Sequence, residues 1–327
     1  MDPIVLFYFA LCNSMMSGAT TKRAPYYYQM RPLTPYFGME ASGCDMSTID
    51  LSDPNFIRRL KQDLIQHRVL LFRQQNLSGK RQVDISNALG TVESTFYRHP
   101  KSPHPDIFRV SNNEEEGCTN VGRSGWHMDG TFQMKPFSYQ TMYFPSVSVG
   151  GDTYFLPMHE FYQSLPAETR QRYDQMWMVT DRRQAPVHPL VYQHPFRNET
   201  TMLFHCGKPF VSGWFQDQTI ESDNDGRQRR RMVNTHTLLP AAPLQVELTQ
   251  QMESKLDQLG LKMQWQAGDF MINDNLGLAH FASDGTQDDP QHVGLRILHR
   301  TTIVGGPETI PQKADGRQSF TTSSSTF

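Results

Sequence analysis

The hydrophobic positions of this chain fall mostly into short runs, which predict many strands with a few helices between them. Runs of about four to eight apolar or alternating residues, bounded by Gly, Pro, Asn or Asp, are typical of strands. Strands are expected at residues 69–72, 107–110, 139–144, 153–156, 187–192, 201–204, 262–265, 270–272 and 295–304. The pattern favours a fold that is mainly β with flanking helices, around a double-stranded β-helix (jelly-roll) core, over a doubly wound parallel sheet.

Apolar residues recur every three or four positions in a smaller set of segments, and this spacing predicts helices. Helices are expected at residues 54–68, 78–89, 159–173 and 243–259. The first follows Ser52 and Asp53, either of which can cap its amino end. Gly90 and Gly260 mark the ends of the second and the fourth. A proline within residues 164–166 interrupts the third.

We predict a single domain at residues 31–306, because no internal repeat or linker-like stretch divides the chain. A leader, residues 1–30, precedes it. The apolar run from Ile4 to Cys12 is too short to span a bilayer and suits the apolar part of a signal peptide, but no Lys or Arg precedes it. A start at the Met-Met pair that follows would leave a hydrophilic leader, so both interpretations stay open. Residues 307–327 end in a run of Ser and Thr, which predicts a disordered tail.

The charge balance gives no support for a polyanionic partner. The 327 residues include 31 Lys and Arg against 33 Asp and Glu, a net charge of −2. Neither nucleic acid nor a membrane surface is therefore favoured. The four cysteines have no CxxC spacing, which argues against a zinc site or a disulfide framework. We expect a cytoplasmic protein that binds a small molecule, and we leave a homo-oligomer open.

The first candidate metal-binding motif is the segment Trp126-His127-Met128-Asp129. In an extended backbone His127 and Asp129 project from the same face, so the imidazole and the carboxylate can bind one divalent metal ion together. His280 offers a third ligand. Two histidines and one carboxylate form the facial arrangement of non-haem Fe(II) oxygenases. A His-x-Asp pair alone is weak evidence, because a surface turn can carry the same two residues.

Six segments in order give the chain a family resemblance. They lie at residues 32–45, 126–129, 150–153, 188–195, 268–280 and 296–305. Together they resemble the taurine dioxygenase family of Fe(II)- and 2-oxoglutarate-dependent oxygenases, over roughly Leu33 to Gly305. The right order of six modest matches makes coincidence a poor explanation.

The resemblance implies a role for each matched residue. His127, Asp129 and His280 would bind Fe(II), while Arg296 and Thr153 would bind the far carboxylate of 2-oxoglutarate. With O2 as the other cosubstrate, the expected reaction is hydroxylation of an aliphatic C–H bond with release of succinate and CO2. Halogenating relatives have a small residue in place of the carboxylate, so Asp129 argues against chlorination.

The substrate is less well defined by the resemblance. Arg300 matches a position that binds a sulfonate or carboxylate, and it shares a strand face with Arg296 if the closing strand is regular. His99 and Phe210 resemble substrate-side residues of the family. Two departures argue against taurine itself: Arg123 replaces an expected Asn, and residues 284–292 are inserted. We therefore expect a small or medium anionic substrate.

Three alternative functions are compatible with parts of the sequence. The chain could be a catalytically inactive or repurposed metal-binding member of the fold, although an intact set of ligands argues against loss. It could be an oxygenase that desaturates rather than hydroxylates. A zinc hydrolase is disfavoured because no Glu general base lies near the motif. The remaining candidate ligands lack a partner at metal spacing and are expected to be structural: His104, His188, His194, His205 and His236.

Overall fold

The structure is a computed structural model that describes residues 27–93, 97–121, 125–180, 182, 184–207, 210–217 and 236–321. Residues 1–26 of the expected leader, including the signal-like run, and residues 322–327 of the expected tail lie outside this part. The structure of the single chain does not test the predicted cytoplasmic location or whether the protein forms a homo-oligomer.

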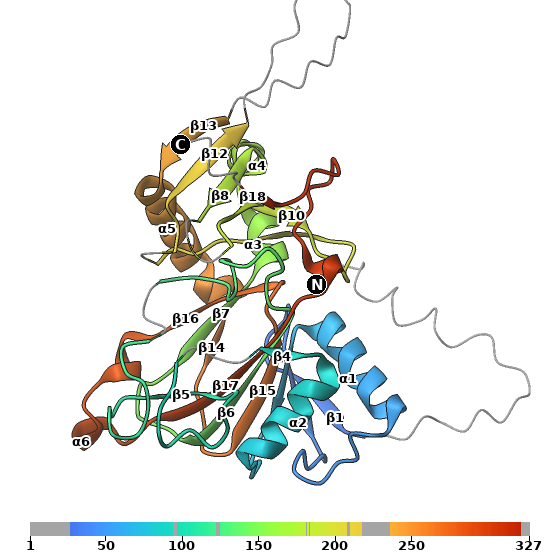
Figure 1. Cartoon of the computed structure of the whole chain (residues 1–327), viewed down its shortest axis with the longest axis vertical. Coiled ribbons are helices and arrows are strands. Elements are labelled where there is room, and N and C mark those ends of the chain that lie inside the picture. Colours follow the sequence, from blue (N-terminus) through green and yellow to red (C-terminus); the bar gives the residue numbers. More distant parts are fainter. Residues whose placement is uncertain are drawn as a thin grey trace, which may run out of the picture.

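Two sheets face each other and form the core of the molecule (Figure 1). The larger has the order β1-β2-β3-β15-β6-β17-β4, with β5 also paired to β17. Its strands are β1 Gln29–Pro32, β2 Met39–Ser42, β3 Val69–Phe72, β4 Val92–Glu93, β5 Phe108–Ser111, β6 Tyr139–Ser146, β15 Asp269–Asp274 and β17 Ile297–Ile303. The smaller sheet has the order β14-β7-β16, with β14 Leu261–Met263, β7 Thr153–Pro157 and β16 Leu278–Ala282. The predicted class, mainly β around a jelly-roll core, is confirmed.

Strand β3 explains why its sequence is apolar without alternation. Val69 and Leu71 pack between the two sheets, in a cluster that includes Phe155 of β7. Leu70 and Phe72 face the opposite way, into a second cluster beneath helices. All four side chains are buried because both faces of the large sheet are covered.

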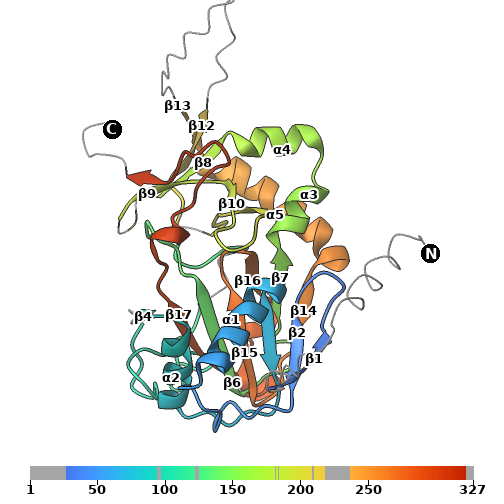
Figure 2. The ribbon, with the colours of Figure 1, turned by 90° about the vertical axis from the view of Figure 1, so that its right-hand side faces the viewer.

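Helices α1 Pro54–His67 and α2 Gly79–Leu89 cover the outer face of the large sheet (Figure 2). Asp53 caps α1 by accepting from the Asn55 amide, and Ser78 caps α2 by accepting from the Arg81 amide. Both helices begin and end where the sequence predicts, within a residue or two.

A second group of elements packs above the end of the sandwich near β7 and β16 (Figure 1). Its helices are α3 Met158–Ser164, α4 Ala167–Asp174 and α5 Ala241–Leu259. Its strands are β8 Met176–Val179, β9 Pro186–Pro189, β10 Val191–Gln193, β11 Thr200–Met202, β12 Gly213–Asp217, β13 His236–Pro240 and β18 Phe320–Thr321. Short turns η1 Asp284–Gln287, α6 Pro290–Val293 and η2 Pro307–Thr309 complete the described elements. The break between α3 and α4 at Leu165 and Pro166 confirms the predicted interruption.

Two sequence predictions are wrong in detail. The strand expected at 187–192 is divided at Leu190, whose amide donates to Met176 and whose carbonyl accepts from Leu203, outside either strand. The tail is not disordered as far as Thr321: Phe320 pairs with Val187, and its ring lies 5.6 Å from the Trp177 ring. The first residue of the Ser/Thr run that suggested disorder, Thr321, still pairs with Pro186.

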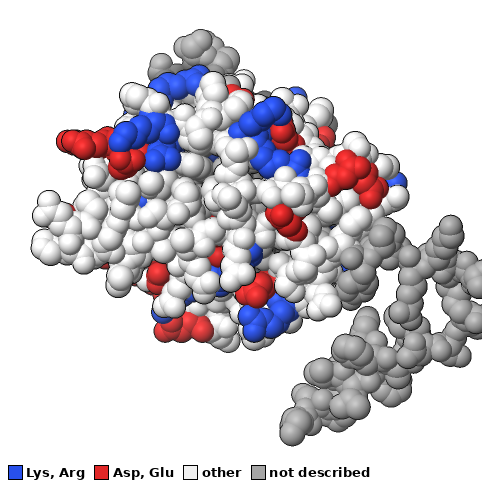
Figure 3. All heavy atoms as spheres, turned by 90° about the horizontal axis from the view of Figure 1, so that it is seen from below, with Lys and Arg blue, Asp and Glu red and all other residues white. Residues whose placement is uncertain are grey.

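No helix in the described ranges is both long and apolar enough to cross a membrane. On the face seen in Figure 3, Lys and Arg side chains are interspersed with Asp and Glu, with no region of a single sign. The mixed surface agrees with the near-zero net charge.

An ion pair between a buried arginine and a partly buried glutamate joins the two parts of the molecule. The Arg68 guanidinium, 3% exposed, donates two bonds of 2.6 Å to Glu160 of α3. The Arg68 carbonyl accepts from the Asp274 amide at the end of β15. The pair therefore fixes α3 against the end of the strand that precedes β16.

We predict that Glu160→Gln lowers the free energy of unfolding by about 3–5 kcal/mol at neutral pH, because Arg68 is left buried without an anion. Burial raises the pKa of the Glu160 carboxyl, but Arg68 lowers it more, so the pKa lies below its ordinary value. The pair's contribution is therefore present above that ordinary value and is lost as the pH falls through the folded-state pKa. Urea unfolding at pH 7 and pH 3.5 measures both effects. The exposed Glu168→Gln is the control, and equal stability of the two variants would contradict the prediction.

Candidate metal centre

The candidate centre is built on a short ladder of backbone hydrogen bonds. The His127 amide donates to the His280 carbonyl at 3.1 Å, and the His280 amide donates back at 2.9 Å. His280 belongs to β16, and His127 lies in the segment beside it. Residues paired directly across such a ladder project to the same side, so the two imidazoles lie together. Their ring centroids are 4.3 Å apart.

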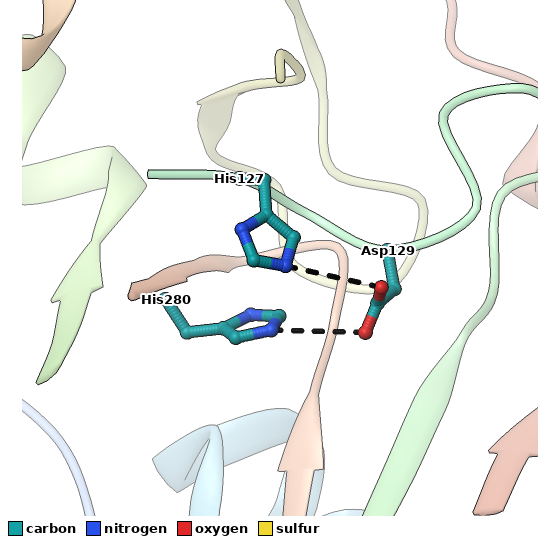
Figure 4. A group of neighbouring side chains, drawn as sticks. All are labelled: His127, Asp129 and His280. Atoms are coloured by element: carbon teal, nitrogen blue, oxygen red, sulfur yellow. Dashed lines mark ion pairs between the residues drawn. The ribbon is translucent and has the colours of Figure 1, made fainter. Parts of the chain in front are cut away.

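Asp129 completes a group of three possible ligands (Figure 4). One carboxylate oxygen lies 4.0 Å from His127 Nε2 and the other 3.7 Å from His280 Nε2. The three ligand atoms lie within 4.8 Å of one another, so a single ion can contact all of them. Two imidazoles and one carboxylate form a donor set that suits Fe(II).

The protonation of the histidines agrees with metal binding. His127 Nδ1 lies 2.7 Å from the Gly125 carbonyl, to which it donates, and this leaves the Nε2 lone pair directed toward Asp129. Burial lowers the pKa of both rings, that of His280 to about 3, with His127 adding to the effect there. Neutral imidazole is the form that binds a metal. His280 Nδ1 is buried and has no hydrogen-bond partner among the described residues.

The Asp129 backbone is fixed by the side chain of Asn275. The Asn275 amide donates to the carbonyls of Asp129 and Phe137, at 2.9 and 2.8 Å. Its oxygen accepts from the Asp129 amide at 2.9 Å and from Gln140 at 2.8 Å. Gly130 has a φ of +80°, and a Cβ there would lie 2.9 Å from the Phe137 nitrogen, so the turn after Asp129 requires glycine. The backbone of Asp129 is thus held in place by the fully buried Asn275 side chain.

Arg300 lies against the carboxylate of Asp129. Its Nη1 donates to Asp129 at 2.6 Å. Burial raises the pKa of Asp129, but the positive charge around it, that of Arg300 foremost, lowers it more, to about 2. The group is therefore ionised at neutral pH, as a ligand must be.

A cavity extends from the two histidines between the sheets. It is lined by Phe108, Val110, Val121, His127, Met142, Thr153, His280, Ala282, Thr286, Arg296, Leu298 and Arg300. The pairing of β17 with β6 shifts register between Ile297 and His299, yet Arg296, Leu298 and Arg300 all face the cavity. The shared face that was conditional on a regular strand is therefore present.

Arg296 is a buried cation without a buried anion beside it. It is 3% exposed, its Nε donates to the Gly151 carbonyl at 3.3 Å, and its guanidinium lies over the Phe144 ring. Burial lowers its pKa to about 10, against an opposing effect of Asp152. No carboxylate lies at ion-pair distance from it in the described part of the chain. A guanidinium in this position favours an anionic ligand.

Thr153 faces the same cavity with a hydroxyl that can donate. Its Oγ1 accepts from the Trp265 indole at 3.0 Å, so its own proton remains for a ligand. The residue is 5% exposed and comes from β7 of the smaller sheet. Thr153 and Arg296 thus reach one cavity from opposite sheets.

The two other substrate candidates differ in position. His99 does not line the cavity; its ring nitrogens contact the Lys101 amide of its own loop and the Glu114 carbonyl in the loop after β5. Phe210 stacks on His205 at 4.1 Å, and His205 stacks on His127 at 4.8 Å. Phe210 is therefore linked to the candidate metal centre through ring stacking on His205, a residue that the sequence analysis expected to be structural. Arg123 lies outside the described residues.

The family model for the taurine catabolism dioxygenase TauD, TfdA family matches residues 29–302. The chain belongs to the TauD/TfdA family. The match covers both sheets and all three residues of the candidate centre.

Characterised relatives extend over nearly the whole chain. An alpha-ketoglutarate-dependent sulfate ester dioxygenase of Pseudomonas putida is 25% identical over 94% of this chain and 99% of its own length. An alkylsulfatase of Acinetobacter baylyi is 26% identical over 89% of this chain and 92% of its own. A taurine dioxygenase structure from Burkholderia xenovorans superimposes with a TM-score of 0.67 at 24% identity, over 91% of this chain and 97% of that one. This last similarity shows the fold.

This TauD/TfdA member is therefore an oxidoreductase that uses Fe(II), 2-oxoglutarate (alpha-ketoglutarate) and O2. The donor set at His127, Asp129 and His280 fits Fe(II). The buried Arg296 guanidinium has no carboxylate partner among the described residues, and this fits a dicarboxylate cosubstrate.

Asn275 is the residue near the centre whose role the sequence did not reveal. It lay within a matched segment, but its partners Asp129 and Phe137 are far away in the chain. In the sequence, an asparagine after a strand is a weak indication of a ligand-positioning residue, because asparagines in that place also stabilise turns.

We predict that Asn275→Ala weakens Fe(II) binding by about 10- to 100-fold, because groups that orient a ligand typically contribute that much. Anaerobic titration with Fe(II), followed by equilibrium dialysis, measures the affinity. Asn273→Ala is the matched control, since Asn273 is also fully buried but has no side-chain partner among the described residues. Similar affinity in both variants would show that Asn275 does not position Asp129.

Proposed function

We propose that this enzyme hydroxylates an aliphatic C–H bond of a small or medium monoanionic substrate, of the alkyl sulfate or related sulfonate and carboxylate type. The observation that carries the proposal is that two arginines, Arg296 and Arg300, enter one cavity beside the His-Asp-His group. 2-Oxoglutarate has one carboxylate to spare after it chelates a metal, so it needs one of these cations. The other remains for the substrate.

In this proposal His127, Asp129 and His280 hold the iron. Arg296 binds the far carboxylate of 2-oxoglutarate through paired charge-assisted hydrogen bonds, and the Thr153 hydroxyl donates to the same group. Phe108, Val110, Met142 and Leu298 make the walls apolar and exclude water. When iron, 2-oxoglutarate and O2 are bound, they supply the oxidising power. One oxygen atom of O2 enters the substrate as a hydroxyl, and the other enters succinate as CO2 leaves.

The formal charges of the cavity favour a single negative charge on the substrate. Arg296, Arg300 and a divalent iron together carry four positive charges, and Asp129 carries one negative charge. 2-Oxoglutarate adds two negative charges, which leaves one positive charge uncompensated. A monoanion beside Arg300 neutralises a site that burial would otherwise penalise.

Arg300 is placed to bind that anion while it remains near Asp129. Its side chain is 21% exposed, and its guanidinium lies over the Phe108 ring at 5.1 Å. One nitrogen contacts Asp129, and a guanidinium has further donors for a second acceptor. The relatives named for sulfate esters and alkyl sulfates make these anions the first class to test.

The deciding experiment has two steps. Anaerobic addition of Fe(II) and 2-oxoglutarate should produce a visible charge-transfer band. Succinate release is then followed with hexyl sulfate, hexanesulfonate, hexanoate and, as a neutral control, hexanol. Turnover of an anion well above hexanol supports the proposal. A band without stimulation by any anion would contradict the substrate class but not the family chemistry.

We predict that Arg296→Gln raises the dissociation constant of 2-oxoglutarate by about 10- to 100-fold, because a hydrogen bond to a charged group contributes about 1.5–3 kcal/mol. Anaerobic titration of the charge-transfer band measures this constant. Arg31→Gln removes an exposed charge on the edge strand β1 and should leave it unchanged. A variant that binds 2-oxoglutarate normally would assign Arg296 to structure alone.

We predict that Arg300→Ala leaves 2-oxoglutarate binding within a few-fold of the wild type. The KM of the anionic substrate should rise by about 10- to 100-fold, because the variant loses a charge-assisted contact. A neutral analogue of the same chain length should lose less. Equal loss of succinate formation with and without substrate would instead assign Arg300 to support of Asp129.

A further inference from the structure

A third histidine lies in register with the two candidate metal ligands. His205 pairs with His127 on the side opposite His280, through bonds from the Met128 amide to the Phe204 carbonyl and from the Cys206 amide to the Trp126 carbonyl. The three imidazoles therefore form a row with His127 in the middle. The His205 and His127 rings are nearly parallel, with an interplanar angle of 24°.

The hydrogen bonds of His205 exclude it as a ligand through Nε2. Its Nδ1 accepts from the Gly207 amide at 2.9 Å, so in the neutral ring the proton is on Nε2. An Nε2 that carries a proton has no lone pair for a metal. The ring thus remains a neutral donor.

The ring is also held rigidly. Phe210 stacks on one face at 4.1 Å and His127 on the other at 4.8 Å. The residue is 5% exposed, and its backbone carbonyl accepts from Gln245 of α5 at 3.1 Å. In the part of the chain that the structure describes, Nε2–H has no acceptor. This N–H is therefore available to donate to a ligand.

The position of His205 separates it from the cosubstrate. The cavity that contains Thr153 and Arg296 is lined by His127 and His280 but not by His205. His205 lies beyond His127, on the side of Phe210 and Phe132, whose rings are 6.4 Å apart. Arg300 lines that cavity as well, so a substrate held by Arg300 reaches His205 only by extending past His127.

We propose that His205 is a substrate-binding residue whose Nε2–H donates a hydrogen bond to an oxygen atom of the anionic substrate, with Phe210 fixing the ring from behind. The proposal rests on the proposed function, because it requires an oxygen-bearing substrate beside the iron. It adds a directional hydrogen bond from an uncharged donor to the ionic contact that Arg300 makes with the substrate. The aromatic residues beside it would then contact the carbon chain of the substrate.

Two variants separate the donor from the ring. His205→Phe keeps an aromatic ring between His127 and Phe210 but removes the N–H. His205→Gln loses the ring but keeps a side-chain N–H donor. Both are loaded anaerobically with Fe(II) and 2-oxoglutarate, and hexyl sulfate is titrated while the perturbation of the charge-transfer band is followed. This readout needs no turnover.

The 2-oxoglutarate dependence of the band should be unchanged in both variants. We expect His205→Phe to weaken hexyl sulfate binding by about 10- to 100-fold, the range of one hydrogen bond to a charged group, and His205→Gln to bind more tightly than His205→Phe. Weaker binding in the Gln variant than in the Phe variant, or a changed 2-oxoglutarate dependence, would overturn the proposal. If no anion perturbs the wild-type band, the proposed substrate class fails instead. A wild-type response that both variants retain in full refutes the role of His205 alone.

Discussion

The backbone ladder between the His127 segment and β16 is the interaction on which the centre depends. Two hydrogen bonds in opposite directions place His127 and His280 side by side, although they are distant in the chain. A slip of one residue would turn one imidazole to the other face and leave the ion with a single histidine. Asn275 secures the third ligand from the same end of the sandwich, by binding both backbone groups of Asp129. The metal site is thus a consequence of sheet register, with one amide side chain added.

Burial of charge is the second constraint. Arg296 is almost fully buried between the sheets, where a cation without an anion is unfavourable. The carboxylate of Asp129 is already paired with Arg300 and flanked by histidines. The cavity therefore carries a surplus of positive charge that bound anions reduce. This is a physical reason for the enzyme to take an anionic cosubstrate, and it is the basis on which we propose an anionic substrate.

The scaffold keeps these charged groups apart from the parts that provide stability. The apolar cluster under α1 and α2 covers the outer face of the large sheet and contains none of the candidate site residues. The Arg68–Glu160 pair anchors α3 close to the turn that leads from β15 into β16. The site can therefore carry a charge imbalance because its supporting elements are packed and hydrogen-bonded independently of any ligand.

The sequence alone determined the jelly-roll class, most strand and helix positions, and the three candidate ligands, because these depend on local periodicity and on short motifs. It did not reveal several strands, namely β1, β2, β4, β8, β12, β13, β16 and β18. For β16 the reason is that the apolar run around His280 is short and follows a turn. It also missed order in residues 307–321, where Phe320 finds a partner in Trp177. The separation of His99 from the cavity, the contact of Arg300 with Asp129 and the stacking of His205 on His127 were decided only by the tertiary structure. Each depends on segments far apart in the chain, and neither composition nor spacing contains the register that brings such segments together.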